Sequence, residues 1–369
     1  MNSRHCLSLV IAFVIAGTAA AQIHDSTDHP GLLSRLKFSA YIDVYYAWYN
    51  DSAGTGKYQQ FPSVSPRSRQ FGLNTVQLGA DYETDKLRAT VVLHYGDIPR
   101  STWSPTLSNI MEAHAGIRIL KKLWIDAGLF RTHFGTEGLL PRENFLSSVS
   151  VNTFYEPYYE AGVRLNYLAN DKLALTIYAL NGYNCYEDNN NKKSFGMLLS
   201  YAFNDKTNAG YSNYIGDDSP EGDSISHLRI HQNIFFNSQL KKFKFQAGLD
   251  YCIQTHSDII YKSIAANMFS GIAAIKYQAL EKFSVAGRVE LFRDPQGIMS
   301  GVITDTEYKL TGYKLWGYSL GVEYKPTGNS YLRIEGRKLR MNEHQQVFNW
   351  KGRPAADRLE FMCNMGISF

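Results

Sequence analysis

The chain has 369 residues, a formal net charge of +4 and 20% charged residues, a balance that gives no reason to expect nucleic acid as a partner. Its mean hydropathy is slightly negative, which excludes a bundle of membrane-spanning helices. Aromatic residues nevertheless make up 14% of the chain, with 25 tyrosines. A transmembrane β-barrel combines these properties, because only alternate strand residues face lipid while aromatic belts mark both interfaces.

Residues 1–21 have the form of a secretory signal peptide. A short basic region precedes the apolar run LSLVIAFVIA, and an A-x-A cleavage site ends at Ala21. The alternative, a membrane anchor, needs about 20 apolar residues, roughly twice the length of this run. We therefore expect export of the mature chain, with residues 22–36 as a short periplasmic tail and residues 37–369 as the barrel.

Seven short polar turns divide the remaining chain into hairpins. Each lies between segments with period-two alternation, such as NTVQLGADY and LRATVVLHY. One further strand at each end, residues 37–49 and 358–369, brings the expected number to about 16, with eight long loops on the other side. The turns lie at Glu83–Lys86, Lys121–Lys122, Ala169–Lys172, Asn204–Thr207, Gln239–Lys242, Leu280–Lys282 and Pro326–Asn329.

The alternation sorts the side chains onto two faces. One face is apolar, as with Phe38, Ile42 and Trp48 in the first strand, and the other carries the charges. Because an Arg or Lys facing lipid near the midplane costs about 2–4 kcal/mol, the charged face must look into water. A soluble β-sandwich also alternates, but it does not explain short turns on one side only or an uncovered apolar terminal strand. We predict an all-β transmembrane antiparallel β-barrel with short periplasmic turns and long extracellular loops.

The charged face supplies candidate pore-lining residues. Fixed guanidinium and carboxylate groups around water favour polar solutes and bias ion selectivity, and the excess of arginine suggests anions. Cross-strand salt bridges that stiffen the wall are the alternative interpretation. The candidates are Arg88, Glu112, Arg118, Asp126, Glu160, Arg164, Arg229, Arg288, Glu290, Arg333, Glu335 and Arg337.

The longest loop spans residues 132–157. It contains Phe145, Val149 and Val151, more apolar content than a solvated loop needs. We therefore favour a loop that folds into the lumen and narrows it, over an outward Ω-loop. The candidate constriction residues are His133, Glu137, Arg142 and Glu143.

Motifs for catalysis or metal binding are weak. Residues 317–321 read GYSLG, a formal match to the nucleophile elbow with Ser319 as nucleophile, but the match lies inside a continuous period-two strand where the elbow requires a helix to follow. His133 and Glu137 lack a third metal ligand. The three cysteines after the signal peptide form neither a zinc motif nor a disulfide framework. We predict no enzymatic activity, no cofactor and no metal.

The run GLFRTHFGTEG, followed by Asn144, Ser147–Ser148 and Pro157–Tyr158, resembles the OmpL-like β-barrel porin (porin-2) family of bacterial outer-membrane proteins. The aromatic first strand FSAYIDVYYAWY and the terminal Phe369 fit the same family. The resemblance extends from about residue 37 to the end of the chain. It implies a diffusion channel and brings no catalytic residues with it.

The expected function is thus a passive outer-membrane channel for small hydrophilic solutes or ions in a Gram-negative cell. The expected partners are outer-membrane lipid, the solutes, and the barrel-assembly machinery, because Phe369 resembles the terminal signature by which such barrels are recognised. A homotrimer is possible, and nucleic acid is not expected. Two alternatives stay open: a barrel-embedded hydrolase acting on lipid or protein, and an adhesin or scaffold with a blocked lumen.

Overall fold

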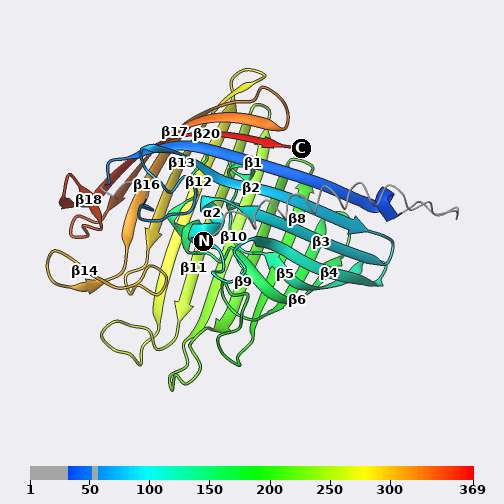
Figure 1. The fold of residues 1–369 in the computed structure, drawn as a ribbon. Helices are drawn as coiled ribbons and strands as arrows, with labels where there is room; N and C mark the ends of the chain where they lie inside the picture. The colour runs from blue at the N-terminus through cyan, green and yellow to red at the C-terminus, as the bar shows by residue number, and fades with distance from the viewer. Residues whose placement is uncertain (1–31, 52–56) are drawn as a thin grey trace, which may run out of the picture. The chain divides into compact units, whose positions relative to one another are not determined.

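The computed structural model describes residues 32–51 and 57–369 (Figure 1). The chain divides into two units, of which the first ends at residue 37 and the second spans residues 38–369. In the first unit the described residues include a short 3-10 helix, η1 (Leu32–Arg35). The predicted signal peptide and most of the predicted periplasmic tail lie outside the described residues and stay predictions.

Within the described residues, sixteen strands form one closed antiparallel barrel in which each strand pairs with the next barrel strand along the chain. This confirms the predicted fold and strand number. The first and last strands each begin one residue earlier than predicted. The strands are β1 (Leu36–Tyr49), β2 (Gln70–Glu83), β3 (Leu87–Tyr95), β4 (Ile110–Leu120), β5 (Leu123–Arg131), β6 (Tyr159–Leu168), β7 (Leu173–Leu180), β8 (Ser194–Asn204), β9 (Thr207–Asp217), β10 (Leu228–Leu240), β11 (Phe243–Gln254), β12 (Ala266–Gln278), β13 (Phe283–Arg293), β16 (Lys314–Tyr324), β17 (Ser330–Met341) and β20 (Asp357–Ser368).

All seven predicted turns join consecutive barrel strands, as expected. The long connections also contain short elements that the sequence did not reveal, because two or three strand residues are too few to show a period. No helix among the described residues is long and apolar enough to cross a membrane. The short elements are α2 (Asp97–Thr102), η2 (Pro141–Glu143), α3 (Val151–Tyr155), the hairpin of β14 (Ile303–Thr304) with β15 (Leu310–Thr311), and the hairpin of β18 (Phe348–Trp350) with β19 (Arg353–Ala355).

The barrel closes where its first and last strands meet. β1 and β20 pair from Tyr41 opposite Ser368 to Tyr49 opposite Glu360, and Figure 1 shows the blue β1 running beside the red β20. Beyond this ladder the Ala40 amide donates to the Phe369 carbonyl at 2.6 Å, and the Phe369 amide donates back at 3.0 Å. Closure leaves no strand edge whose peptide groups would lack partners in lipid.

Exposure alternates along the strands as the two-face interpretation predicts. In β20, Leu359, Phe361 and Ile367 lie on the exposed outer surface, whereas Arg358 and Glu360 are buried on the inner side. The same alternation runs through β16 and β17. The middle of the outer surface is therefore apolar, as a membrane barrel requires of the surface that faces lipid.

Much of the apolar core lies inside the barrel, toward the ends of the strands that carry the long loops. Met268, Phe292 and Leu339 project inward from β12, β13 and β17 and belong to one buried cluster with Phe61 of the loop after β1. Tyr155 of α3 stacks on Phe292 with ring centroids 5.4 Å apart. The inward-folded loops thus fill part of the lumen with packed side chains.

A charged substitution in the middle of the outward row of β16 tests whether that row faces lipid. Leu320 is 63% exposed in β16, and Leu320→Arg should lower the free energy of folding into lipid vesicles by about 2–4 kcal/mol, because the guanidinium would face hydrocarbon. Denaturant titration in vesicles measures this. Tyr308→Arg, at a loop position that is 91% exposed, is the control and should change folding by less than about 0.5 kcal/mol. Equal losses in the two variants would show that the row does not face lipid.

Candidate functional site in the barrel lumen

The predicted pore-lining residues all lie on barrel strands, but they fall into two environments. Arg88, Glu112, Arg118, Arg164 and Arg229 are partly exposed. The remaining candidates are buried, most of them against the loop that connects β5 and β6. The buried candidates are Asp126, Glu160, Arg288, Glu290, Arg333, Glu335 and Arg337.

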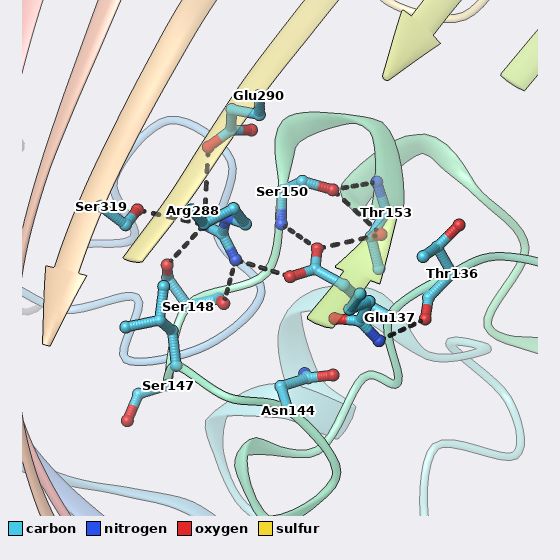
Figure 2. A network of polar contacts seen from close by, with 12 residues as sticks. Thr136, Glu137, Asn144, Ser147, Ser148, Ser150, Thr153, Arg288, Glu290 and Ser319 are labelled. Atoms are coloured by element: carbon cyan, nitrogen blue, oxygen red, sulfur yellow. Dashed lines mark hydrogen bonds and ion pairs between the residues drawn. The ribbon is translucent and has the colours of Figure 1, made fainter. Parts of the chain in front are cut away.

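The loop of residues 132–158 folds into the lumen, the arrangement that its apolar content predicts. Its Glu137 accepts a hydrogen bond from Arg288 of β13, with Oε1 2.7 Å from Nη1. Figure 2 shows Arg288 pointing between Glu137, Ser148 and Glu290. The second Glu137 oxygen accepts from the amide of Ser150, 2.7 Å away, so the same carboxylate joins the wall to the loop backbone.

Four buried wall residues, Arg288, Glu290, Arg333 and Glu335, hold this loop, and we call them the wall clamp. Glu335 Oε2 accepts from the amides of residues 147 and 148, at 2.7 and 3.0 Å. Glu290 Oε2 accepts from the amide of residue 151 at 2.7 Å. Arg333 donates to the carbonyls of residues 141 and 144, at 2.5 and 2.9 Å. The clamp therefore binds the loop largely through its backbone.

Three members of the wall clamp also form ion pairs. Besides the contact of Arg288 with Glu137, Arg333 Nε lies 2.6 Å from Glu323 Oε2, and Arg337 Nη2 lies 2.7 Å from Glu290 Oε1. Buried ions are tolerated only when they are paired and hydrogen-bonded, and removal of one partner typically costs about 3–5 kcal/mol. The position of the loop and the charges of the wall consequently depend on each other.

His133, at the start of the loop, lies between two acceptors. Its Nδ1 is 2.9 Å from Glu160 Oε1, and its Nε2 is 2.8 Å from the carbonyl of Asn213. Burial lowers the pKa of this imidazole, but the Glu160 charge and both hydrogen bonds outweigh burial and raise the pKa above its ordinary value. Because both ring nitrogens face acceptors, the geometry suits the doubly protonated cation.

Glu156, at the end of α3, is a buried carboxylic acid whose surroundings favour its uncharged form, whereas those of His133 favour the charged form. Burial, together with the carboxylates of Asp250 and Glu137, raises the pKa of Glu156 well above its usual range. Its Oε1 accepts a hydrogen bond from Asn152 Nδ2 at 2.6 Å. The raised pKa favours the uncharged carboxyl, which is the form that packs inside the barrel at the lower cost when no cation is paired with it.

On the opposite side of the lumen, inner charges remain in contact with water. Asp126 of β5 is fully buried and accepts from Arg88 of β3 at 2.5 Å and from Arg164 of β6 at 2.9 Å. Gly116 of β4 leaves room for this carboxylate, since a Cβ atom there would collide with it. The two guanidinium groups are thereby held against the wall with part of their surface exposed.

A cluster of cations lies beside the short turn between β4 and β5. Arg88 and Arg118 lie over the Trp124 ring, with Cζ 4.5 and 4.6 Å from the ring centroid. Lys121 and Lys122 of the turn line the same hollow of about 380 Å³. We call these four cations the mouth cluster, because short turns face the periplasm in barrels of this kind. Cation–π contact holds the two guanidinium planes in fixed positions.

The tip of the inward loop carries two further exposed charges. Arg142 lies over the Tyr41 ring at 4.4 Å and donates to Gln77 Oε1 at 3.3 Å. Glu143 forms a bidentate pair with Arg131 at 2.6 and 2.5 Å. Of the four candidate constriction residues, therefore, Arg142 and Glu143 are exposed inside the barrel while His133 and Glu137 are buried in contacts with the wall.

One sequence interpretation needs correction. The wall clamp does not form part of a water-facing charged ring, because the loop covers it. The sequence had already argued against a metal site at His133 and Glu137, and in the structure His133 contacts Glu160 while Glu137 contacts Arg288. Ser319 lies in the middle of β16 with no helix after it, so the elbow geometry is not present. Among residues 32–51 and 57–369, no group of three or more His, Cys, Asp or Glu side chains is arranged to hold a metal ion.

Sequence reasoning also missed contacts that matter here. The cation–π contact between Arg88 and Trp124 could not be predicted, because the two residues lie on different hairpins and local sequence patterns do not show which hairpins meet. The hydrogen bonds from the loop amides to Glu335 and Glu290 could not be predicted either, because every residue type except proline has the same backbone N–H group. Two candidates remain, and both are partly exposed: Arg229 donates to Gln254 Oε1 at 2.9 Å, and Glu112 Oε2 lies 3.6 Å from His114 Nε2.

Known structures share this architecture at low sequence identity, which shows the fold alone. The outer membrane channel DcaP of Acinetobacter baumannii aligns with a TM-score of 0.61 and 10% identity, over 90% of this chain and 97% of that chain. OprB of Pseudomonas putida aligns with a TM-score of 0.60 and 11% identity, over 92% and 95%. OmpF of Salmonella typhi, in complex with daunomycin, aligns with a TM-score of 0.58 and 12% identity, over 90% and 97%.

No curated protein matches this chain. A family model does match, and it covers residues 35–369, nearly the whole chain. Its description reads "Putative beta-barrel porin-2, OmpL-like", which confirms the resemblance drawn from the run GLFRTHFGTEG. With the closed sixteen-stranded barrel, this match shows that the chain belongs to the OmpL-like porin-2 family and is a channel of the bacterial outer membrane.

Proposed function

We propose that this porin is a passive channel whose path runs past the mouth cluster and the loop tip, and that it passes small hydrophilic solutes with a preference for anions. The observation that carries the proposal concerns two arginines. Inside the barrel Arg118 is partly exposed and Arg142 is exposed, and neither forms an ion pair with any described residue. Their charge is therefore available to a passing solute.

The surroundings strengthen that charge. Fixed cations in a channel with low-dielectric walls raise the local concentration of anions and lower that of cations. A guanidinium group held on an aromatic face presents its N–H fork in the geometry that carboxylates and phosphates accept. Lys121 and Lys122 add charge at the same mouth. Carboxylates are present as well. Asp126 is occupied by Arg88 and Arg164, and Glu143 by Arg131. The partly exposed Glu112 lies 3.6 Å from His114 and is the carboxylate that opposes the anion preference.

The preference for anions over cations can be measured from the reversal potential under a salt gradient in planar bilayers. Replacing Arg118, Lys121 and Lys122 with glutamine should lower the anion-to-cation permeability ratio at least about twofold, because the mouth loses three positive charges. The matched control replaces Lys206, Lys242 and Lys282 with glutamine, which removes the same charge from exposed turns that do not border this hollow. An unchanged ratio in the first variant, or an equal change in both, would contradict the proposal. A bilayer without conductance steps would contradict the channel itself.

We further propose that the wall clamp sets the width of the path by holding the loop of residues 132–158 in place. Arg288 is 2% exposed and contacts Glu137, Glu290 and Ser148 at once. Without its guanidinium group, the two carboxylates would be left buried with less compensating charge. The loop would then gain access to conformations that widen the lumen.

Arg288→Gln should therefore raise the single-channel conductance and lower the stability of the barrel by about 3–5 kcal/mol. Conductance steps and denaturant titration measure the two effects. Ser319→Ala is the control, because its hydroxyl contacts Arg288 only at 3.4 Å, and it should change neither quantity appreciably. An assembled Arg288→Gln channel with wild-type conductance would show that the clamp does not set the width.

The end of the chain supports a proposal about assembly. Phe369 is 72% exposed, so its ring is accessible to the barrel-assembly machinery, while its backbone pairs with Ala40 at the seam. The association of three barrels stays a prediction from the sequence.

Deletion of Phe369 should reduce outer-membrane assembly in cells more than it reduces refolding into detergent micelles, because only the cellular route uses recognition. Heat-modifiable mobility on gels reports both yields. Phe369→Tyr keeps the aromatic ring and the backbone pair, and it should behave like the wild type in both assays. Equal losses in cells and in micelles would assign the effect to seam closure.

A further inference from the structure

The outer surface of the barrel carries a group of cations at the extracellular ends of three adjacent strands. Arg293 ends β13, Lys314 begins β16 and Arg340 lies near the end of β17. All three belong to the outward rows, which also hold the exposed apolar residues of these strands. We call Arg293, Lys314 and Arg340 the outer cation cluster.

The strand register brings these cations together. Arg293 lies directly opposite Lys314, and Arg340 lies opposite Trp316, two residues from Lys314 on the same face. Directly opposed residues in a ladder approach within about 5 Å, and like charges in that position destabilise a sheet. An arrangement that places two cations face to face is favourable when an anion lies between them.

No described carboxylate supplies that anion. Asp357 is opposite Arg340 in the ladder, but its ion pair is with Lys338, at 3.7 Å. Glu343 borders the cluster and pairs with His344, at 3.4 Å. Among the described residues, the three cations of the outer cation cluster have no ion-pair partner, in contrast to the two arginines of the wall clamp.

The cluster also surrounds a hollow. A depression of about 340 Å³ is bordered by Arg293, Lys314 and Arg340, with the apolar surfaces of Leu291 and Trp316 on the membrane side. Its volume is large enough for a phosphate together with part of the group that carries it. The combination of cationic and apolar borders fits an amphipathic ligand.

The position of the cluster relative to the aromatic belt, along the membrane normal, indicates the class of that ligand. Along the outward row of β16 the side chains run from Tyr324, through apolar residues, to Tyr318 and Trp316, and Lys314 follows next. Aromatic belts mark the membrane–water interfaces, so Lys314 lies just beyond the outer belt. β13 and β16 are joined there by the long connection 294–313, which identifies this end as extracellular.

We propose that the outer cation cluster binds the phosphate group of a phosphorylated glycolipid in the outer leaflet, the leaflet that the cluster faces. Arg293 and Arg340 offer N–H forks to phosphate oxygens, and Lys314 between them offers a point charge. Trp316 and Leu291 contact the saccharide and the beginning of the acyl chains. The site is separate from the lumen, so it serves attachment to the membrane and not permeation.

Native mass spectrometry of the purified barrel with added bisphosphorylated lipid A tests the proposal. The wild type should retain one lipid A, and lipid A without phosphates should bind at least tenfold more weakly. The variant Arg293→Gln/Lys314→Gln/Arg340→Gln should also bind lipid A at least tenfold more weakly, a change of about 1.4 kcal/mol. Its single-channel conductance should equal that of the wild type, because the cluster faces away from the lumen.

The control Lys262→Gln/Lys351→Gln/Arg353→Gln removes the same charge from exposed extracellular loop positions and should bind lipid A like the wild type. Wild-type binding in the cluster variant, or an equal loss in the control, would overturn the proposal. Displacement of lipid A by an equal concentration of inorganic phosphate would also overturn it, because the site would then belong to a free anion. If the triple variant does not assemble, Arg293→Gln alone provides the same test and should weaken lipid A binding severalfold.

Discussion

Lipid offers no hydrogen-bond partner to a peptide group, and the rest of this structure follows from that constraint. Every strand must pair on both sides, so the sheet has to close, and it does so where β1 meets β20. Closure then gives each strand one face toward lipid and one toward the interior. Alternate residues of each strand must therefore suit two different environments, the apolar lipid and the polar interior of the barrel.

Inside the barrel, the same requirement governs the charges. The wall clamp is too deeply buried for water to solvate it, so its carboxylates and guanidinium groups need partners within the protein. The backbone of the loop supplies many of them, because Glu335 and Glu290 accept from its amides and Arg333 donates to its carbonyls. The loop in turn gains partners for peptide groups that would otherwise be buried without any.

The lumen is consequently asymmetric. The loop and the apolar clusters fill part of the interior, whereas Arg88, Arg118 and Arg164 of β3, β4 and β6 stay partly exposed. A symmetric ring of charges would act equally on solutes anywhere in the cross-section, but cations gathered on one side act on solutes that pass along that side. The outer cation cluster gathers cations on the outer surface, where Lys314 follows Trp316 and Tyr318 in the outward row of β16.

The sequence alone determined the fold class, the number of strands, the turns and the face of nearly every strand residue, because a period of two and short polar turns are local signals. It also identified the inward loop from its apolar content and the family from the run GLFRTHFGTEG. Only the tertiary structure decided which inner charges meet water. Arg88 and Arg333 are equivalent in sequence pattern, yet Arg88 is partly exposed beside Trp124 and Arg333 is buried under the loop. The physical reason is that burial of a wall residue depends on a loop from a distant part of the chain, and residue periodicity carries no information about that contact.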